Sequence, residues 1–359
     1  MVSNIKVLIV DDSILFREAL ARELRKDPRL VIVGTASDPF DARDKIIALK
    51  PDVMTLDVEM PKMNGIDFLR RLLPQYPLPV IVSSSLAAAV FDAIAAGAVD
   101  FVAKPGAEQG AMEAYAADMI AKIKIAADVD VASKFKPALR PQPQTRSQQT
   151  AGEALLRITR RPDANQLLAV GASTGGTEAI FNVLTKLPAD IPGTVIVQHM
   201  PGGFTKLYAE RLNKACAFEV REAEDNDTVR PGLALLAPGG TYQMRLVKGP
   251  RGYSVRLVDM EKVSGHKPSV DFLFDSVAEA AGRDAIGVIL TGMGADGAKG
   301  LLKMRERGAY TIGQDQASCV VYGMPMVAFN AGAVVKQLPL DRIAQEICGR
   351  LSLRANRHA

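Results

Sequence analysis

The first 125 residues alternate short apolar runs with amphipathic stretches. The apolar runs predict buried strands, and the stretches between them predict helices, as in Ser13–Lys26, where Ala19, Leu20 and Leu24 recur at helical spacing. Five strands separated by helices predict a doubly wound parallel sheet, because a parallel pair needs a crossover connection. The predicted strands are Lys6–Val10, Val31–Thr35, Val53–Asp57, Val80–Ser84 and Asp100–Ala103.

A second series of strand-like runs, separated by glycines and prolines, begins at Leu167. It predicts a second α/β domain with a doubly wound parallel sheet. The stretch from Leu233 to Val258, with KGPRG as its turn, has the pattern of a hairpin and predicts a few antiparallel strands at an edge of that sheet. The predicted strands are Leu167–Gly171, Thr194–Gln198, Leu233–Ala237, Ser254–Val258, Ala285–Leu290 and Ala309–Gln314.

The alternating pattern fails between the two series. The piece KFKPALRPQPQTRSQQT contains three prolines and several glutamines, with too few large apolar residues to offset the entropy of ordering. We therefore predict a domain at residues 1–125, a flexible, basic linker rich in proline and glutamine at 126–165, and a second domain at 166–352. A length of 359 residues agrees with two hydrophobic cores.

Charge and composition exclude several classes of function. The net charge of +4 comes mainly from the basic linker, and neither a stripe of Arg and Lys with aromatics nor a helix-turn-helix is found, so nucleic acid is not an expected partner. No run approaches the roughly 18 apolar residues of a membrane span, and the N-terminus lacks the pattern of a secretory signal. Three separated cysteines predict neither disulfides nor a zinc site. We expect a cytoplasmic protein without membrane insertion.

Acidic residues follow two strands of the first domain. Asp11 and Asp12 come at the end of the first strand and Asp57 at the end of the third, so their carboxylates should meet at one sheet edge. Clustered carboxylates repel one another unless a cation lies among them, and oxygen ligands at a solvated edge suit Mg²⁺. Ser84 ends a further strand and Lys104 follows another, and both could stabilise a phosphoryl group on a carboxylate. Any one of these residues could be a strand-end cap, but the whole set favours a phosphoryl site.

The segments VLIVDDS, MTLDVEMPKMNG, PVIVSSS and GAVDFVAKP resemble the response-regulator receivers of two-component signalling. The resemblance implies a flavodoxin-like fold, a histidine kinase as partner, and Asp57 as the phosphorylated carboxylate. It implies that Mg²⁺ is bound by Asp57, by Asp12 and by the carbonyl of Glu59, with Asp11 acting through water.

The same resemblance implies that Ser84 and Phe101 form the pair that switches on phosphorylation, with Lys104 contacting the phosphoryl group. The chain differs from the receiver pattern after Ser85, where the loop LAAAVFDA is short and apolar. This difference bears on partner contacts at that face rather than on the chemistry.

A serine, a histidine and an aspartate follow three strands of the second domain. Ser173, in GASTGG, sits on a tight turn before a predicted helix, so its hydroxyl is exposed near helix N-terminal amides. Such a turn also suits a phosphate, but it lacks the lysine of a P-loop and the glycine spacing of a dinucleotide fingerprint. His199 ends the next strand and Asp296 lies in LTGMGADG after another. The three predict a nucleophile, its base and a carboxylate that orients the base.

The order Ser, His, Asp along the chain is not that of an α/β-hydrolase, whose histidine comes last. Only His358 could fill that role, and it lies one residue from the chain end. His266, in the polar segment GHKPSVDF, is interpreted as a substrate-side or structural residue. Met293 lies in a glycine-rich turn before Asp296, so its backbone N–H is a candidate oxyanion donor.

The segments VGASTGGTEAI, VIVQHMPGGFT, LAPGG, KPSVDFLFDSV, VILTGMGADGAKGL and CVVYGMP resemble the catalytic domain of the chemotaxis protein-glutamate methylesterases. The resemblance implies Ser173, His199 and Asp296 as a triad that needs no cofactor. It implies demethylation of glutamate methyl esters on chemoreceptors, with glutamine deamidation as a second activity, in chemotaxis adaptation.

The leading hypothesis is an esterase and amidase that phosphorylation activates, in which the first domain covers the edge bearing Ser173 until Asp57 is phosphorylated. Two alternatives remain. One is a non-catalytic signalling adaptor that binds a peptide or acidic ligand at the Ser173 turn. The other is a nucleotide-binding output domain that uses the GASTGG and TGMGADG loops.

Overall fold

The computed structural model describes residues 4–61, 63–106, 108–131 and 165–355, with side chains described as far as residue 352. The chain forms two compact units. Most of the predicted linker, and His358 with it, lies outside the described residues. No helix in the described ranges is both long and apolar enough to cross a membrane.

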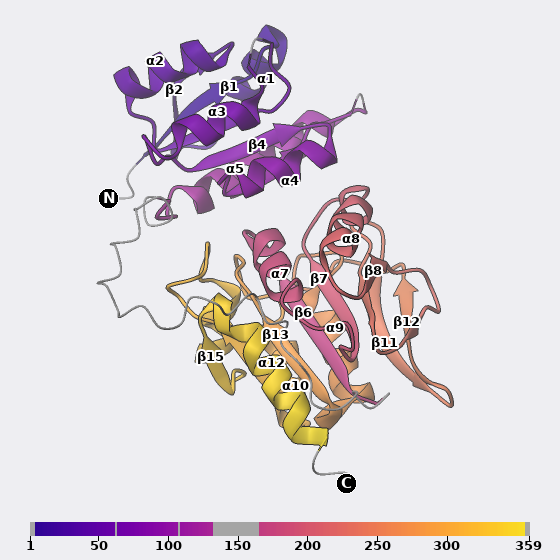
Figure 1. The fold of residues 1–359 in the computed structure, drawn as a ribbon. Helices are drawn as coiled ribbons and strands as arrows, with labels where there is room; N and C mark the ends of the chain where they lie inside the picture. The colour runs from indigo at the N-terminus through magenta and orange to yellow at the C-terminus, as the bar shows by residue number, and fades with distance from the viewer. Residues whose placement is uncertain (1–3, 62, 107, 132–164, 356–359) are drawn as a thin grey trace, which may run out of the picture. The chain divides into compact units, whose positions relative to one another are not determined.

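The first unit is a five-stranded parallel sheet with the order β2-β1-β3-β4-β5, and helices cover it (Figure 1). This confirms the predicted doubly wound fold, and three of the five predicted strands have the predicted bounds. The strands are β1 (Ile5–Val10), β2 (Leu30–Ala36), β3 (Val53–Asp57), β4 (Val80–Ser84) and β5 (Asp100–Ala103). The helices are α1 (Ile14–Leu24), α2 (Pro39–Leu49), α3 (Gly65–Leu72), α4 (Ala87–Ala95) and α5 (Ala111–Ala126).

Helix starts in this unit follow local chemistry. The Asp38 side chain accepts hydrogen bonds from the amides of Phe40 and Asp41 at the start of α2, where Pro39 occupies the first turn. An aspartate cap and an early proline are typical of a helix N-terminus. The two features end the preceding loop and begin α2 at a defined residue.

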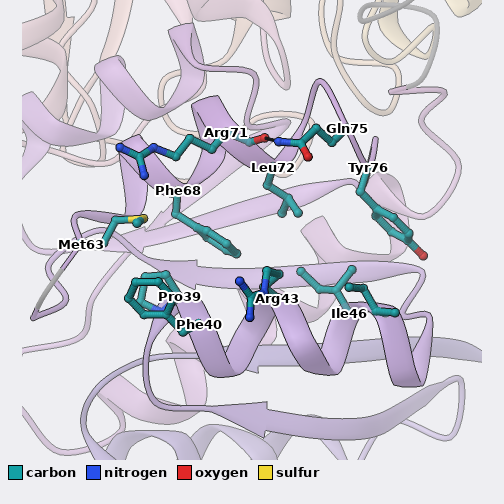
Figure 2. Close-up of a pocket in the computed structure, with 11 residues that line it drawn as sticks. Pro39, Phe40, Arg43, Ile46, Met63, Phe68, Arg71, Leu72, Gln75 and Tyr76 are labelled. Carbon is teal, nitrogen blue, oxygen red and sulfur yellow. Dashed lines mark hydrogen bonds between the residues drawn. The ribbon is translucent and has the colours of Figure 1, made fainter.

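The first unit also has a groove of about 390 Å³ between α2 and α3. Figure 2 shows Phe68 and Leu72 of α3 pointing toward Phe40 and Ile46 of α2. None of the acidic residues at the strand ends lines this groove. It is therefore separate from the predicted phosphoryl site.

The second unit has a seven-stranded sheet with the order β15-β14-β13-β6-β7-β10-β8, in which every pair is parallel. Its strands are β6 (Leu167–Ala172), β7 (Gly193–Gln198), β8 (Glu219–Glu222), β10 (Leu233–Leu236), β13 (Ala285–Ile289), β14 (Tyr310–Gln314) and β15 (Lys336–Leu338). Its helices are α7 (Gly176–Leu184), α8 (Phe204–Ala215), α9 (Val270–Ala280), a 3₁₀ turn η1 (Gly282–Asp284), α10 (Ala298–Glu306), α11 (Met324–Asn330) and α12 (Leu340–Ala355).

The antiparallel strands form a sheet of their own with the order β11-β12-β9. These strands are β9 (Thr228–Val229), β11 (Gln243–Gly249) and β12 (Gly252–Val258). The hairpin and its turn were predicted, but their position at an edge of the parallel sheet was not correct. Leu233–Leu236 is not part of the hairpin, because it pairs with β7 and β8 inside the parallel sheet.

The main core of the second unit lies on one face of its parallel sheet. Leu167, Val195 and Leu235 of the sheet pack with α9, α10 and the antiparallel strands in a single cluster. Helices α7 and α12 contact each other on the opposite face (Figure 1). Covering both faces explains why β6 and β7 are buried along their whole length.

Candidate functional site

Three carboxylates meet at the carboxyl edge of the first unit's sheet. Asp11 follows β1, Asp57 ends β3, and these strands are neighbours. Carboxylate oxygens of Asp11, Asp12 and Asp57 lie within 4.8 Å of one another. Asp11 and Asp57 are buried, whereas Asp12 is exposed. The cluster forms at the edge where the sequence predicted it.

Lys104 neutralises part of this negative charge. Its Nζ lies 2.8 Å from Asp11 Oδ2 and 2.7 Å from Asp57 Oδ2. Burial raises the pKa of Asp57, and the hydrogen bond from Lys104 only partly offsets this effect. Burial lowers the pKa of Lys104, but its hydrogen bonds to the two carboxylates outweigh burial and leave that pKa raised. The lysine therefore stays charged.

The donor set fits a small divalent cation. Clustered carboxylate oxygens at a partly solvated edge are the ligands that Mg²⁺ prefers, because it keeps several waters and needs few protein groups. Near them, the Glu59 amide donates to Asp57 Oδ1 at 3.1 Å, which turns the chain beside the cluster. The role of the Glu59 carbonyl as a ligand stays a prediction.

Ser84 and Phe101, the predicted switch pair, lie on neighbouring strands β4 and β5 and are both buried. The Ser84 hydroxyl accepts a hydrogen bond from the Leu86 amide at 3.0 Å. Lys122 lies over the Phe101 ring, 5.0 Å from its centroid. Movement of either side chain would therefore break contacts that this structure makes.

In the second unit, neighbouring strands bring the predicted serine and histidine together. Ala172 of β6 pairs with Gln198 of β7, and the His199 amide donates to the Ala172 carbonyl at 3.1 Å. Ser173 and His199 therefore follow the two strands in the same register. Asp296 lies in the loop after β13, which pairs with β6 on its other side.

The turn at Ser173 is fixed by its backbone. The Ser173 amide donates to the Thr291 carbonyl at 3.0 Å, and the Ser173 carbonyl accepts from the amide of Gly176 at 2.7 Å and from Gln198 Nε2 at 2.9 Å. A Cβ at Gly176 would lie 2.2 Å from Gln198 Oε1. A Cβ there would also lie 2.6 Å from Ala172 Cβ, so glycine fits closely at this position, where α7 begins.

Asp296 is 2% exposed and is surrounded by donors. It accepts from His199 Nε2 at 2.8 Å, from the Ser269 hydroxyl at 2.8 Å, and from two amides at the start of α9, of Val270 at 2.7 Å and of Asp271 at 2.9 Å. Burial raises the pKa of Asp296. The hydrogen bonds outweigh this effect, that with His199 most of all, and the pKa lies below its ordinary value. Asp296 is therefore an ionised carboxylate that only accepts.

The tautomer of His199 follows from this contact. Because Asp296 only accepts, Nε2 of His199 carries the proton that binds it, and Nδ1 is the basic nitrogen. Nδ1 is buried and has no hydrogen-bond partner within the described part of the chain. The site thus contains a base whose free nitrogen is not solvated, next to the turn that bears a hydroxyl.

His266, which the sequence indicated as a substrate-side or structural residue, lies directly against His199. Its ring stacks on the ring of His199, with centroids 3.7 Å apart and planes at 10°. Burial, followed by the nearby His199, lowers the pKa of His266 to about 4. This contact joins two loops that are distant in the sequence, so no spacing in the sequence indicates it.

Met293 is 47% exposed at the edge of the site. It lies between Gly292 and Gly294, and Gly294 has a positive φ of 82°. A Cβ at Gly292 would lie 2.7 Å from Ser173 Cβ, so this turn packs directly against the turn that bears Ser173. The assignment of the Met293 amide as an oxyanion donor stays a prediction.

Sequence reasoning missed two buried polar residues that support the site. Ser269 donates to Asp296 and also caps α9, where its hydroxyl accepts from the Phe272 amide at 3.3 Å. The serine before an apolar helix was visible as a capping signal in SVDF. Gln243 accepts from the Ser269 amide at 2.7 Å, and no local pattern indicates that contact.

Comparison with known proteins gives the same two parts. A sequence model of the CheB methylesterase matches residues 168–347, and one of the response regulator receiver domain matches residues 7–116. A protein-glutamate methylesterase/protein-glutamine glutaminase 2 of Syntrophomonas wolfei is 55% identical, over 96% of this chain and 97% of that protein.

Two further relatives agree. A protein-glutamate methylesterase/protein-glutamine glutaminase of Syntrophotalea carbinolica is 49% identical over 99% of both chains. The Thermotoga maritima CheB methylesterase catalytic domain, known from a crystal structure, is 36% identical in sequence, with a TM-score of 0.50. The match covers 52% of this chain and 98% of that domain. The chain therefore belongs to the CheB methylesterase family, as a protein-glutamate methylesterase/protein-glutamine glutaminase with a receiver domain.

Proposed function

We propose that Ser173, His199 and Asp296 perform the hydrolysis of glutamate methyl esters and of glutamine side-chain amides in chemoreceptors. The observation that carries the assignment is the hydrogen bond of 2.8 Å between His199 Nε2 and the buried carboxylate Asp296. It holds the imidazole with Nδ1 free to take a proton, and β6 and β7 hold Ser173 in register beside it.

The reaction proceeds through an acyl-enzyme. His199 Nδ1 takes the proton of Ser173 Oγ as that oxygen attacks the side-chain carbonyl, and the proton then passes to the leaving group, which departs as methanol or ammonia. Water, deprotonated by the same nitrogen, cleaves the acyl-enzyme and releases glutamate. Asp296 stabilises the transient imidazolium, because it stays ionised.

We assign the developing oxyanion to the backbone amide of Met293. The turn that contains Met293 packs against Ser173, since a Cβ on the neighbouring Gly292 would lie 2.7 Å from Ser173 Cβ. An amide donor of this kind is typically worth about 2.7–4 kcal/mol of barrier. The esterase chemistry then needs no cofactor.

The receiver supplies the control. Asp57 takes a phosphoryl group from the histidine kinase of the chemotaxis pathway, in the cytoplasm. Asp12, Asp57 and the Glu59 carbonyl would hold Mg²⁺, with Asp11 acting through water, and the cation would offset charge on the oxygens. Lys104 contacts the phosphoryl group, and Ser84 and Phe101 switch with it. The proposed division is a receiver at 1–125, a linker at 126–165 and a catalytic domain at 166–352.

Labelling with a fluorophosphonate tests the nucleophile, since only an activated serine reacts readily. The full-length protein should be labelled at Ser173, as mapped by mass spectrometry, and both Ser173→Ala and His199→Gln should abolish labelling. Ser254→Ala, on β12, is the matched control and should be labelled like the wild type. An unlabelled wild type, as expected for a binding adaptor, would contradict the proposal.

A further inference from the structure

The plane of the His199 ring is not fixed by its hydrogen bond. Asp296 contacts one ring nitrogen, Nε2, and the terminal torsion of a histidine is intrinsically broad. Rotation about that torsion moves Nδ1 farther than it moves Nε2, because Nδ1 lies farther from the torsion axis. Something else must therefore hold the ring plane if the base is to act efficiently.

His266 covers one face of that ring. Its imidazole lies parallel to His199, with an interplanar angle of 10° and a centroid distance of 3.7 Å. Contact between ring faces at this distance is close packing, so His199 cannot rotate without colliding with His266. The contact does not use the ring edges of His266, where its nitrogens lie.

The loop that carries His266 is itself held firmly. Gln243, fully buried on β11, donates from Nε2 to the His266 carbonyl at 2.9 Å and accepts from the Ser269 amide at 2.7 Å. The amides of Val263 and His266 each donate to the other's carbonyl, at 3.0 and 2.9 Å. The antiparallel sheet thus anchors the backbone on both sides of the stacking ring.

The charge of His266 suits a neighbour of the base. Its pKa is lowered to about 4 by burial and by His199, with Lys262 acting in the same direction and Asp296 opposing. The ring is therefore neutral in neutral solution. A neutral ring does not repel the imidazolium that forms on His199 when it takes the Ser173 proton, whereas a charged one would.

We propose that His266 is a positioning residue, which holds the plane of the His199 imidazole so that Nδ1 faces Ser173. The role needs a flat, uncharged ring rather than an ionisable group. This inference rests on the proposed assignment of His199 as the base.

The test compares His266→Ala with His266→Phe in the full-length protein, with methylated chemoreceptor as substrate and methanol release as readout. Alanine removes the ring, so kcat should fall about tenfold to a hundredfold, which is the cost of a misplaced catalytic group. KM should change by less than about twofold. Phenylalanine restores a flat ring, so kcat should lie within about threefold of the wild type, with the same pH profile. The rate of fluorophosphonate labelling at Ser173, which involves no receptor, should fall in parallel with kcat in His266→Ala.

Three results would overturn the proposal. Wild-type kcat in His266→Ala would show that the ring is not needed. A folded His266→Phe as slow as the alanine variant would assign a role to the ring nitrogens. A rise in KM with unchanged labelling would make His266 a substrate contact. Ser173→Ala, run in the same assay, tests the triad separately, because retained methanol release there would refute the proposed function itself.

Discussion

Asp296 binds His199 through Nε2, at 2.8 Å, and so leaves Nδ1 as the unprotonated nitrogen of the ring. The chymotrypsin triad uses the opposite arrangement, in which the aspartate binds Nδ1 and Nε2 is the base. Here Asp296 is held at the N-terminus of α9 by the Ser269 hydroxyl and two helix amides. The helix thus fixes the carboxylate, and the ionised carboxylate selects the tautomer of His199 that carries its proton on Nε2.

Asp296→Asn should lower kcat by about 10⁴, as the equivalent change does in the chymotrypsin triad. An asparagine can present its NH₂ to Nε2, which would move the ring proton to Nδ1 and leave no base for Ser173. The measurement is methanol release by the full-length variant. Asp275→Asn, at a half-buried position on α9 away from His199, is the matched control and should be unchanged. An Asp296→Asn enzyme within tenfold of the wild type would contradict the assignment.

Gly292→Ala should damage both stability and catalysis. The added Cβ would lie 2.3 Å from Met324 Sδ and 2.7 Å from Ser173 Cβ, so the turn that bears Ser173 must shift. Overpacking of this kind costs about 1–3 kcal/mol, which denaturant unfolding would measure together with a fall in kcat. Gly349→Ala has no neighbour within 4 Å and lies in α12, so it should leave kcat unchanged and not destabilise the protein. Equal behaviour of the two variants would show that the turn tolerates a side chain.

Asp57→Asn should keep the unstimulated hydrolysis rate but lose all activation by a small phosphodonor such as acetyl phosphate. The substitution removes the acceptor oxygen in the first unit and touches none of the second unit's triad. A divalent-metal chelator should have the same effect on the wild type. The comparison is methanol release with and without phosphodonor. Activation that survives in Asp57→Asn, or basal hydrolysis that the chelator abolishes, would contradict the division of roles.

The same substitution should stabilise the receiver at neutral pH. Burial raises the pKa of Asp57 above its ordinary value of 3.8, so the folded receiver binds a proton more tightly than the unfolded chain. The ionised carboxylate therefore destabilises the fold at neutral pH, and this penalty disappears as the pH falls below 3.8. Unfolding of both proteins, without metal, should show an advantage for Asp57→Asn at pH 7 that shrinks on acidification. If the stability advantage of Asp57→Asn grew on acidification, the pKa of Asp57 would be lowered by folding rather than raised, which would contradict this prediction.

The sequence predicted the parallel strands well because buried parallel strands are continuous apolar runs. Val53–Asp57 and Val80–Ser84 have the predicted bounds for this reason. Glu219–Glu222 was missed, since its sequence EVRE is charged and forms a partly exposed edge strand of the sheet. Leu233–Leu236 was assigned to the hairpin because an apolar run does not reveal which sheet it joins.

The site was predictable to the extent that its residues follow strands. Ser173 and His199 come at the ends of β6 and β7, and sheet topology alone brings such ends together. The contacts of His266 and Gln243 were not predictable, because they depend on how the antiparallel sheet packs beside the parallel one. Residues that support a site from another sheet leave no periodic signal in the sequence.

The most direct test of the account measures methanol released from a methylated chemoreceptor by the full-length protein, with phosphodonor and Mg²⁺ present. The wild type should release methanol, and Ser173→Ala should release none above the background of the receptor alone, with both proteins equally folded by circular dichroism. Methanol release by Ser173→Ala at a rate near that of the wild type would contradict Ser173 as the nucleophile and, with it, the acyl-enzyme mechanism.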